Sequence, residues 1–148
     1  MVHTILGSCV AVSLWDPVLH FGSINHYMLP DKAESTSFKY GNIAIAELIK
    51  RMVGMGSIKS NIKAKVFGGS EMANSNGIFN IGERNIILAK EMLKDERIPI
   101  VSFSVGGPVG RKVIFNSATG EVLISYIKHS VNLADQIKID YKFNLLGK

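Results

Sequence analysis

The sequence predicts a single domain of mixed α and β structure. The chain has 148 residues, which suits one compact domain and is too short for two. Hydrophobic residues make up 47% of it and charged residues 20%, so it can bury a core and lacks the composition of a disordered protein. Two stretches carry apolar residues at helical spacing, and several short runs rich in Val, Ile and Leu are bounded by turn residues. We therefore expect residues 1–148 to form one domain.

The first half of the chain predicts two strands followed by a helix. Residues 4–14 are rich in Val, Ile and Leu and end before an Asp-Pro pair, which indicates one mostly buried strand. Residues 21–29, "FGSINHYML", indicate a second strand, and the turn residues of "DPVLHFG" between them favour a hairpin. Apolar residues then recur at helical spacing over residues 40–54, which predicts an amphipathic helix.

The second half predicts one more helix among several strands. "KAKVFGG" is a short strand that ends on two glycines, and Asn80 followed by Glu83 predicts the capped start of a helix through Leu93. "IPIVSFSV" is typical of a buried strand, and "RKVIFNSATGEVLISYI" indicates two strands around a turn. The pattern weakens over residues 132–148, which we interpret as a docked tail or a partner-binding segment.

The charge distribution favours a protein that does not bind nucleic acid. The net charge is +5, but the chain has no Arg-rich cluster and no basic stretch interleaved with aromatic residues. Five basic residues follow one another without an acidic residue between them: Lys50, Arg51, Lys59, Lys63 and Lys65. They form either a solvated face or a patch that steers an acidic partner.

The residues that usually hold metals or form disulfides are sparse. Cys9 is the only cysteine, which excludes an internal disulfide, and the four histidines have no metal-site spacing. The first 15 residues lack charged side chains, but they have no basic region and are shorter than the ~20 residues of a spanning helix. We therefore expect a cytoplasmic protein without metal, cofactor or membrane insertion.

Cys9, in "LGSCVAV", raises the question of whether the thiol does chemistry. A lone cysteine is more often a buried and inert residue. However, Gly7 and Ser8 directly before it permit a tight backbone and leave N–H donors near the sulfur, as a developing oxyanion requires. Both interpretations stay open on this segment alone.

His26, in "INHYMLP", is the candidate partner of this thiol. If the two predicted strands pair, Cys9 and His26 face each other, because cross-strand neighbours lie about 5 Å apart at Cβ. Thr4, on the same predicted strand as Cys9, can orient the imidazole with its hydroxyl, which completes the layout of an activated thiol nucleophile. The alternative is that His26 is a core residue among its apolar neighbours.

Five motifs resemble those of one known family. "TILGSCVAVSLWDP" followed by "INHYMLP" is similar to the start of the chemoreceptor glutamine deamidases, the CheD family of chemotaxis proteins. "KAKVFGGSEM", "NIGERNI" and "VGGPVGRKVIFNSATGEV" resemble later motifs of that family in the same order. The resemblance extends from Thr4 to Val122.

The resemblance implies an enzyme that converts a chemoreceptor glutamine to glutamate. A cysteine attacks the side-chain amide, ammonia leaves, and water hydrolyses the thioester. Carried over by motif, the nucleophile is Cys9 and the histidine is His26. The third member is a threonine shortly before the Gly-Ser-Cys, which favours Thr4 and leaves His3 as the other candidate position. Ser23 stands where the family often has a second glycine, which leaves open a slightly altered approach to the site.

The resemblance also implies a fold and partners. The fold is a single α/β domain whose layered β-sheets pack against two main helices, similar to the bacterial toxin deamidases. The substrate is a cytoplasmic helix of a chemoreceptor, for which Gly7 and Ser8 are candidate contacts, although Ser8 is as readily a turn residue. The chemotaxis phosphatase CheC is the second implied partner and can dock over the active site.

The glycine pairs in "FGGSEM" and "GGPVGRK" have two interpretations. They are simple turn glycines, or the two loops flank the active site and shape a groove for a receptor helix. In the second case Arg111 and Lys112 meet acidic receptor side chains.

Two other functions compete with deamidation. One is a regulatory binding partner of CheC with little turnover, but such a chain has no chemical need for Cys9 and His26. The other is a papain-like cysteine hydrolase, which places its cysteine at a helix N-terminus, whereas Cys9 precedes both predicted helices.

Overall fold

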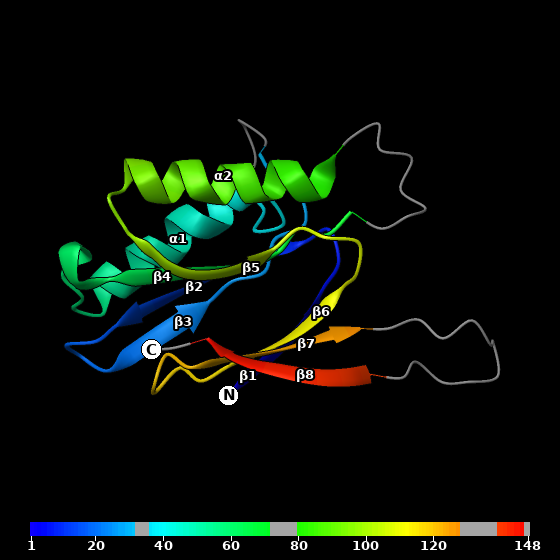
Figure 1. Ribbon diagram of the computed structural model, residues 1–148. Helices are drawn as coiled ribbons and strands as arrows, with labels where there is room; N and C mark the ends of the chain where they lie inside the picture. Colours follow the sequence, from blue (N-terminus) through cyan, green and yellow to red (C-terminus); the bar gives the residue numbers. More distant parts are fainter. Residues whose placement is uncertain (32–35, 72–79, 128–138, 147–148) are drawn as a thin grey trace, which may run out of the picture.

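The computed structural model describes residues 1–31, 36–71, 80–127 and 139–146, which form three layers (Figure 1). Two helices cover one face of a four-stranded sheet, and a second four-stranded sheet covers its other face. The described elements are β1 (Val2–Leu6), β2 (Val10–Asp16), β3 (Phe21–Ile24), α1 (Gly41–Gly54), the 3-10 turn Lys59–Asn61, β4 (Lys63–Gly68), α2 (Ile81–Asp95), β5 (Ile100–Val105), β6 (Arg111–Phe115), β7 (Val122–Ile127) and β8 (Ile139–Leu146). The predicted α/β class with two main helices is confirmed.

The central sheet has the order β3-β2-β4-β5, and the outer sheet has the order β1-β6-β7-β8. Every residue of β2 is buried, because helices cover one of its faces and the outer sheet covers the other. Val10, Val12 and Leu14 pack against the helices, whereas Ala11 packs against the outer sheet. This double burial explains the unbroken apolar run that predicted the strand.

Both helices lie where their apolar spacing predicts. Ile86, Ala89 and Leu93 are buried along α2, as expected. The predicted capping role of Asn80 is wrong, although Asn80 does occupy the N-cap position, because its side chain makes no capping hydrogen bond. The carboxylate of Glu71 instead accepts a hydrogen bond from the backbone N–H of Glu83, at 3.1 Å.

The single strand expected over residues 4–14 is two strands of different sheets. β1 pairs with β6 in the outer sheet, and β2 pairs with β3 and β4 in the central sheet. The chain crosses between the sheets at residues 7–9, which we call the cysteine bend. The prediction that Thr4 and Cys9 share a strand is therefore wrong, since a local apolar pattern does not reveal a crossing between layers. The expected antiparallel pairing of the next strand is confirmed by β2 and β3, although β3 ends at Ile24.

The remaining strands correct one expectation and refine another. β5 pairs with β4 at the edge of the central sheet, and its Val101 and Phe103 are 47% and 63% exposed, so the expectation of a buried strand is wrong. Residues 139–146 form β8, which pairs with β7 at the edge of the outer sheet. Residues 132–138 lie outside the described residues.

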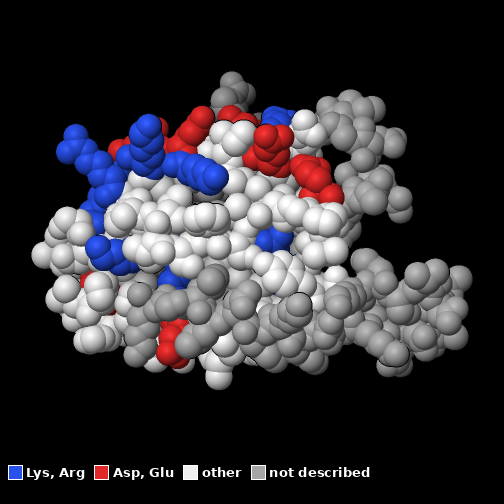
Figure 2. All heavy atoms as spheres, viewed as in Figure 1, with Lys and Arg blue, Asp and Glu red and all other residues white. Residues whose placement is uncertain are grey.

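The run of basic residues does not form one surface patch. The Lys65 side chain is buried and donates to the carbonyl of Gly120 at 2.9 Å. Lys59 forms an ion pair with Glu96, and Arg51 forms one with Glu47. Figure 2 shows Lys and Arg gathered at the end of the molecule where α2 ends, with Asp and Glu along the outer side of α2.

Candidate active site

The cysteine bend is held by hydrogen bonds to its carbonyl oxygens. The carbonyl of Gly7 accepts from both the N–H and the hydroxyl of Ser70, each at 2.9 Å. The carbonyl of Cys9 accepts from the N–H of Gly69 at 2.8 Å. The loop after β4 therefore fixes both ends of the bend.

The two glycines of "FGGSEM" are required by this close approach. Gly68 has φ +100°, and a Cβ there would lie 2.2 Å from the carbonyl oxygen of Cys9. Gly69 has φ +69°, and its Cβ would lie 2.4 Å from the side chain of Ile86. These are turn glycines, as one interpretation expected, and they also support the segment that carries the thiol.

Asn85 holds the middle of the bend and was not singled out by the sequence. Its side chain is fully buried on α2, and its amide nitrogen donates to the carbonyls of Ser8 and Met28, each at 3.0 Å. A sequence signal for it does exist: Asn85 is a polar residue four positions before Ala89, and it therefore lies on the buried face of the helix, where a polar side chain needs hydrogen-bond partners.

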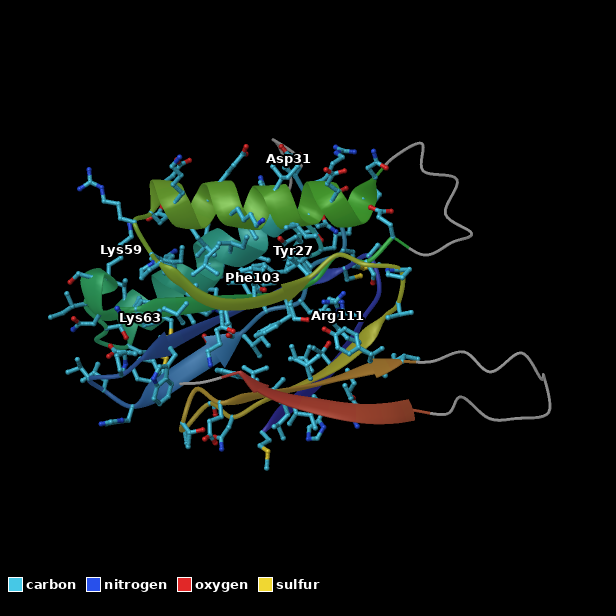
Figure 3. All side chains as sticks on the ribbon, viewed as in Figure 1. Tyr27, Asp31, Lys59, Lys63, Phe103 and Arg111 are labelled. Carbon is cyan, nitrogen blue, oxygen red and sulfur yellow. The ribbon has the colours of Figure 1, made fainter. Side chains whose placement is uncertain are left out.

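The register of the chain places Cys9 and His26 on the same face of the central sheet. Val10 and Tyr27 pair as an isolated bridge, with N–H to carbonyl distances of 3.1 and 2.9 Å. The side chains of Val10 and Tyr27 belong to the core under the helices, and Figure 3 shows Tyr27 there. Successive side chains of an extended chain alternate between faces, so Cys9 and His26, the residues directly before them, point to the opposite face. Cys9 and His26 are diagonal neighbours rather than the direct pair expected, and no hydrogen bond joins thiol and imidazole within the described residues.

Thr4 reaches the imidazole from the outer sheet. Its Oγ1 lies 2.8 Å from Nδ1 of His26. Strand alternation places Thr4 and Leu6 on one face of β1 and His3 on the other, where His3 is exposed. The three expected catalytic side chains thus come from β1, the cysteine bend and the segment after β3.

The pKa shifts of Cys9 and His26 both favour the neutral forms. Burial raises the pKa of the half-buried Cys9 thiol, and its own backbone N–H only partly offsets this effect. Partial burial of the ring lowers the pKa of His26. These directions give no support for a charged imidazole that lowers the thiol pKa in the free protein, and that expectation stays a prediction.

Arg111 is buried between the sheets, so the expectation that it meets acidic receptor side chains is wrong (Figure 3). Its guanidinium donates to the hydroxyl of Ser104 at 2.8 Å and to the carbonyl of Gly106. The N–H of Gly106 in turn donates to the carbonyl of Gly68 at 2.9 Å. Arg111 therefore supports the loop that supports the cysteine bend.

A pocket of about 230 Å³ opens beside His26. Its wall includes Phe38 and Leu48, together with the ion pair of Arg51 and Glu47 at 3.0 Å. Among the residues that the structure describes, no three His, Cys, Asp or Glu side chains gather as a metal site requires. The helices in that part of the chain are too short or too polar to cross a membrane.

Comparison with known proteins finds one family model and relatives that share one name. Residues 28–126 match the family model "CheD chemotactic sensory transduction". A "Probable chemoreceptor glutamine deamidase CheD" from Trichlorobacter lovleyi is 44% identical over 126 residues, which cover 83% of this chain and 78% of that protein. Proteins of the same name from Sulfurimonas denitrificans and Clostridium acetobutylicum are 41% and 40% identical over 133 and 124 residues. These alignments cover 86% and 79% of this chain, and 85% and 75% of the respective relatives.

Proposed function

Because this chain belongs to the CheD family, we propose that it is a protein-glutamine deamidase that converts chemoreceptor glutamines to glutamates in bacterial chemotaxis. The observation that carries the proposal is the 2.8 Å contact between Thr4 and His26, on the face of the central sheet that also carries Cys9. A nucleophile, a base and a group that orients the base are the three parts that thiol catalysis requires.

In the first step the Cys9 sulfur attacks the side-chain amide carbon of the substrate. His26 is neutral, because its pKa is lowered, and it accepts the thiol proton as the C–S bond forms. In the tautomer that carries its proton on Nδ1, His26 donates a hydrogen bond to Thr4 and leaves Nε2 free for this transfer. General-base activation suits a thiol whose own pKa is raised.

The tetrahedral intermediate carries a negative oxygen that needs donors. The N–H groups of Ser8 and Cys9 donate no backbone hydrogen bond within the described residues. They are the proposed oxyanion donors, worth about 3 kcal/mol each in comparable enzymes. Ser8 thus contacts the substrate through its backbone N–H, next to Gly7, whose carbonyl is held by Ser70.

Collapse of the intermediate breaks the C–N bond, and the imidazolium of His26 protonates the departing ammonia. Water then attacks the thioester with His26 again as base, which releases glutamate and restores the thiol. No cofactor takes part in this sequence.

The chemistry takes place on cytoplasmic helices of the receptor, and the pocket beside His26 receives a side chain next to the target glutamine. CheC, the second proposed partner, competes for this face.

The test uses a purified receptor cytoplasmic fragment and peptide mass spectrometry. Deamidation adds about one mass unit to a peptide, and we expect it with the natural chain and not with Cys9→Ala. Cys9→Ser is the matched variant, because it keeps the shape of the side chain and removes only the thiol. Deamidation by both variants at the natural rate would contradict the proposal. Tight CheC binding without any deamidation would instead support a regulatory binding protein.

A further inference from the structure

Asn85 joins the two segments that carry the proposed nucleophile and base. Its amide nitrogen donates one hydrogen bond to Ser8, directly before Cys9, and one to Met28, two residues after His26. Both acceptors are carbonyl oxygens, so the atom that faces them is the nitrogen, whose two N–H groups suffice for both bonds. One buried side chain therefore fixes the separation of the two segments.

The bond to Ser8 also sets the direction of a backbone donor. The described chain has no cis peptide bond, so the carbonyl of Ser8 and the N–H of Cys9 point in opposite directions across one planar unit. Since the carbonyl is turned toward α2, the N–H is turned away from α2. Ser70 acts in the same way on the preceding unit, by holding the carbonyl of Gly7.

Asn85 is itself held in place by the core. It is fully buried, and its own backbone carbonyl accepts a hydrogen bond from the Tyr27 hydroxyl at 2.5 Å. Burial raises the pKa of Tyr27, so this hydroxyl stays protonated and remains a donor. The side-chain oxygen of Asn85 has no hydrogen-bond partner within the described residues. Within the described residues all hydrogen bonds of this side chain are made by its two amide N–H groups, so the observation favours a role for the amide donors.

We propose that Asn85 is a positioning residue, which aims the Cys9 N–H at the oxyanion of the substrate and holds the cysteine bend at a fixed distance from the histidine segment. This inference rests on the proposed deamidation. Asn85 is buried beneath both segments, so it acts through them and does not touch the substrate. Its loss therefore lowers kcat and leaves KM for the receptor fragment near the natural value.

The test compares Asn85→Leu, which removes both donors at similar volume, with Ala89→Gly on the same face of α2. Ala89 is also fully buried, and its replacement loosens the helix without changing either hydrogen bond. We expect kcat to fall about 10- to 100-fold in Asn85→Leu and less than about threefold in Ala89→Gly. Asn85→Gln keeps the donors on a longer arm, and we expect it to recover part of the loss. Thermal unfolding of each variant shows whether it is folded at the assay temperature.

A second readout separates this inference from the proposed function. Acylation of Cys9 by p-nitrophenyl acetate passes through an oxyanion, whereas alkylation by iodoacetamide does not, and Cys9 is the only thiol in the chain. We expect Asn85→Leu to slow acylation of Cys9 at least about tenfold and to change alkylation less than about threefold. Equal effects on the two reactions, or kcat losses no larger than those of Ala89→Gly, would overturn the role of Asn85. Normal acylation by the natural chain without receptor deamidation would refute the proposed function and leave the positioning role standing.

Discussion

The cysteine bend and the histidine segment, residues 25–29, differ in how the fold holds them. The carbonyls of the bend are bound by Ser70 and Asn85, which lie 63 and 77 positions away in sequence from their acceptors. The backbone of the histidine segment is bound by β2 of the same hairpin at residues 25 and 27, as in the pairing of Val10 and Tyr27. At residues 28 and 29 it is bound by Lys39, Gly41 and Asn85. The His26 side chain is only partly buried, and its hydrogen bond within the described residues is to Thr4. The carbonyls around the nucleophile are thus held by groups far away in sequence, whereas the backbone on both sides of His26 is held by the hairpin and the imidazole itself by one hydroxyl.

The largest expected effect comes from breaking the support of the bend with Gly68→Ala. The new Cβ meets the Cys9 carbonyl and the backbone has a positive φ, so we expect a loss of at least about 2 kcal/mol of unfolding free energy. Urea unfolding measures this loss. Gly107 has a positive φ of +79° too, but a Cβ there would meet nothing within 4 Å. Gly107→Ala therefore measures backbone strain without a steric clash and should cost about 1 kcal/mol of unfolding free energy.

Gly54→Ala is the second control, because its Cβ meets nothing within 4 Å at the end of α1. It should be neutral or slightly stabilising. If Gly68→Ala unfolded at the same urea concentration as Gly54→Ala, the bend would be less constrained than the hydrogen bonds around it indicate.

The histidine side is tested by Thr4→Val, which removes the hydroxyl at nearly constant volume. We expect kcat to fall about tenfold, equivalent to about 1.4 kcal/mol, because the imidazole loses the group that orients it. The unfolding free energy should change by less than about 1 kcal/mol at this half-buried position. His3→Val on the opposite, exposed face of β1 is the matched control and should keep natural activity. If His3→Val lowered kcat more than Thr4→Val, the third catalytic position would be assigned to His3.

The same comparison explains what the sequence could predict. The hairpin of β2 and β3 is local, so turn residues and apolar runs were enough to place Cys9 near His26. Asn85 and Ser70 act over long sequence separations, and no periodicity reports which carbonyl they bind. The crossing between sheets at residues 7–9 was missed for a related reason. An apolar strand looks the same in the sequence whichever sheet it joins. The motifs predicted that Thr4 orients His26, but only the structure shows that Thr4 reaches it from the outer sheet.

The protonation states of Cys9 and His26 predict how catalysis and thiol alkylation depend on pH. The pKa of Cys9 is raised and that of His26 is lowered, so both groups are neutral between the two values. We expect kcat/KM to rise as His26 loses its proton, with a midpoint below the ordinary pKa of a histidine. Alkylation by iodoacetamide should have its midpoint above the ordinary pKa of a cysteine. His26→Ala should leave the alkylation midpoint above that value. A midpoint below pH 7 in the natural chain would indicate a preformed thiolate and imidazolium pair.

The smallest expected effect concerns the ion pair beside His26. The Arg51 side chain is 66% exposed, and its partner Glu47 is 33% exposed one helical turn away. We expect Arg51→Ala to change the unfolding free energy by less than about 0.5 kcal/mol, because exposed pairs of this kind contribute little. Urea unfolding at low and at high salt is the measurement, with Lys50→Ala, an exposed neighbour on the same helix, as the control. A salt-dependent loss above about 1 kcal/mol for Arg51→Ala alone would show that this ion pair holds the surroundings of His26. The contrast between base and nucleophile would then fail.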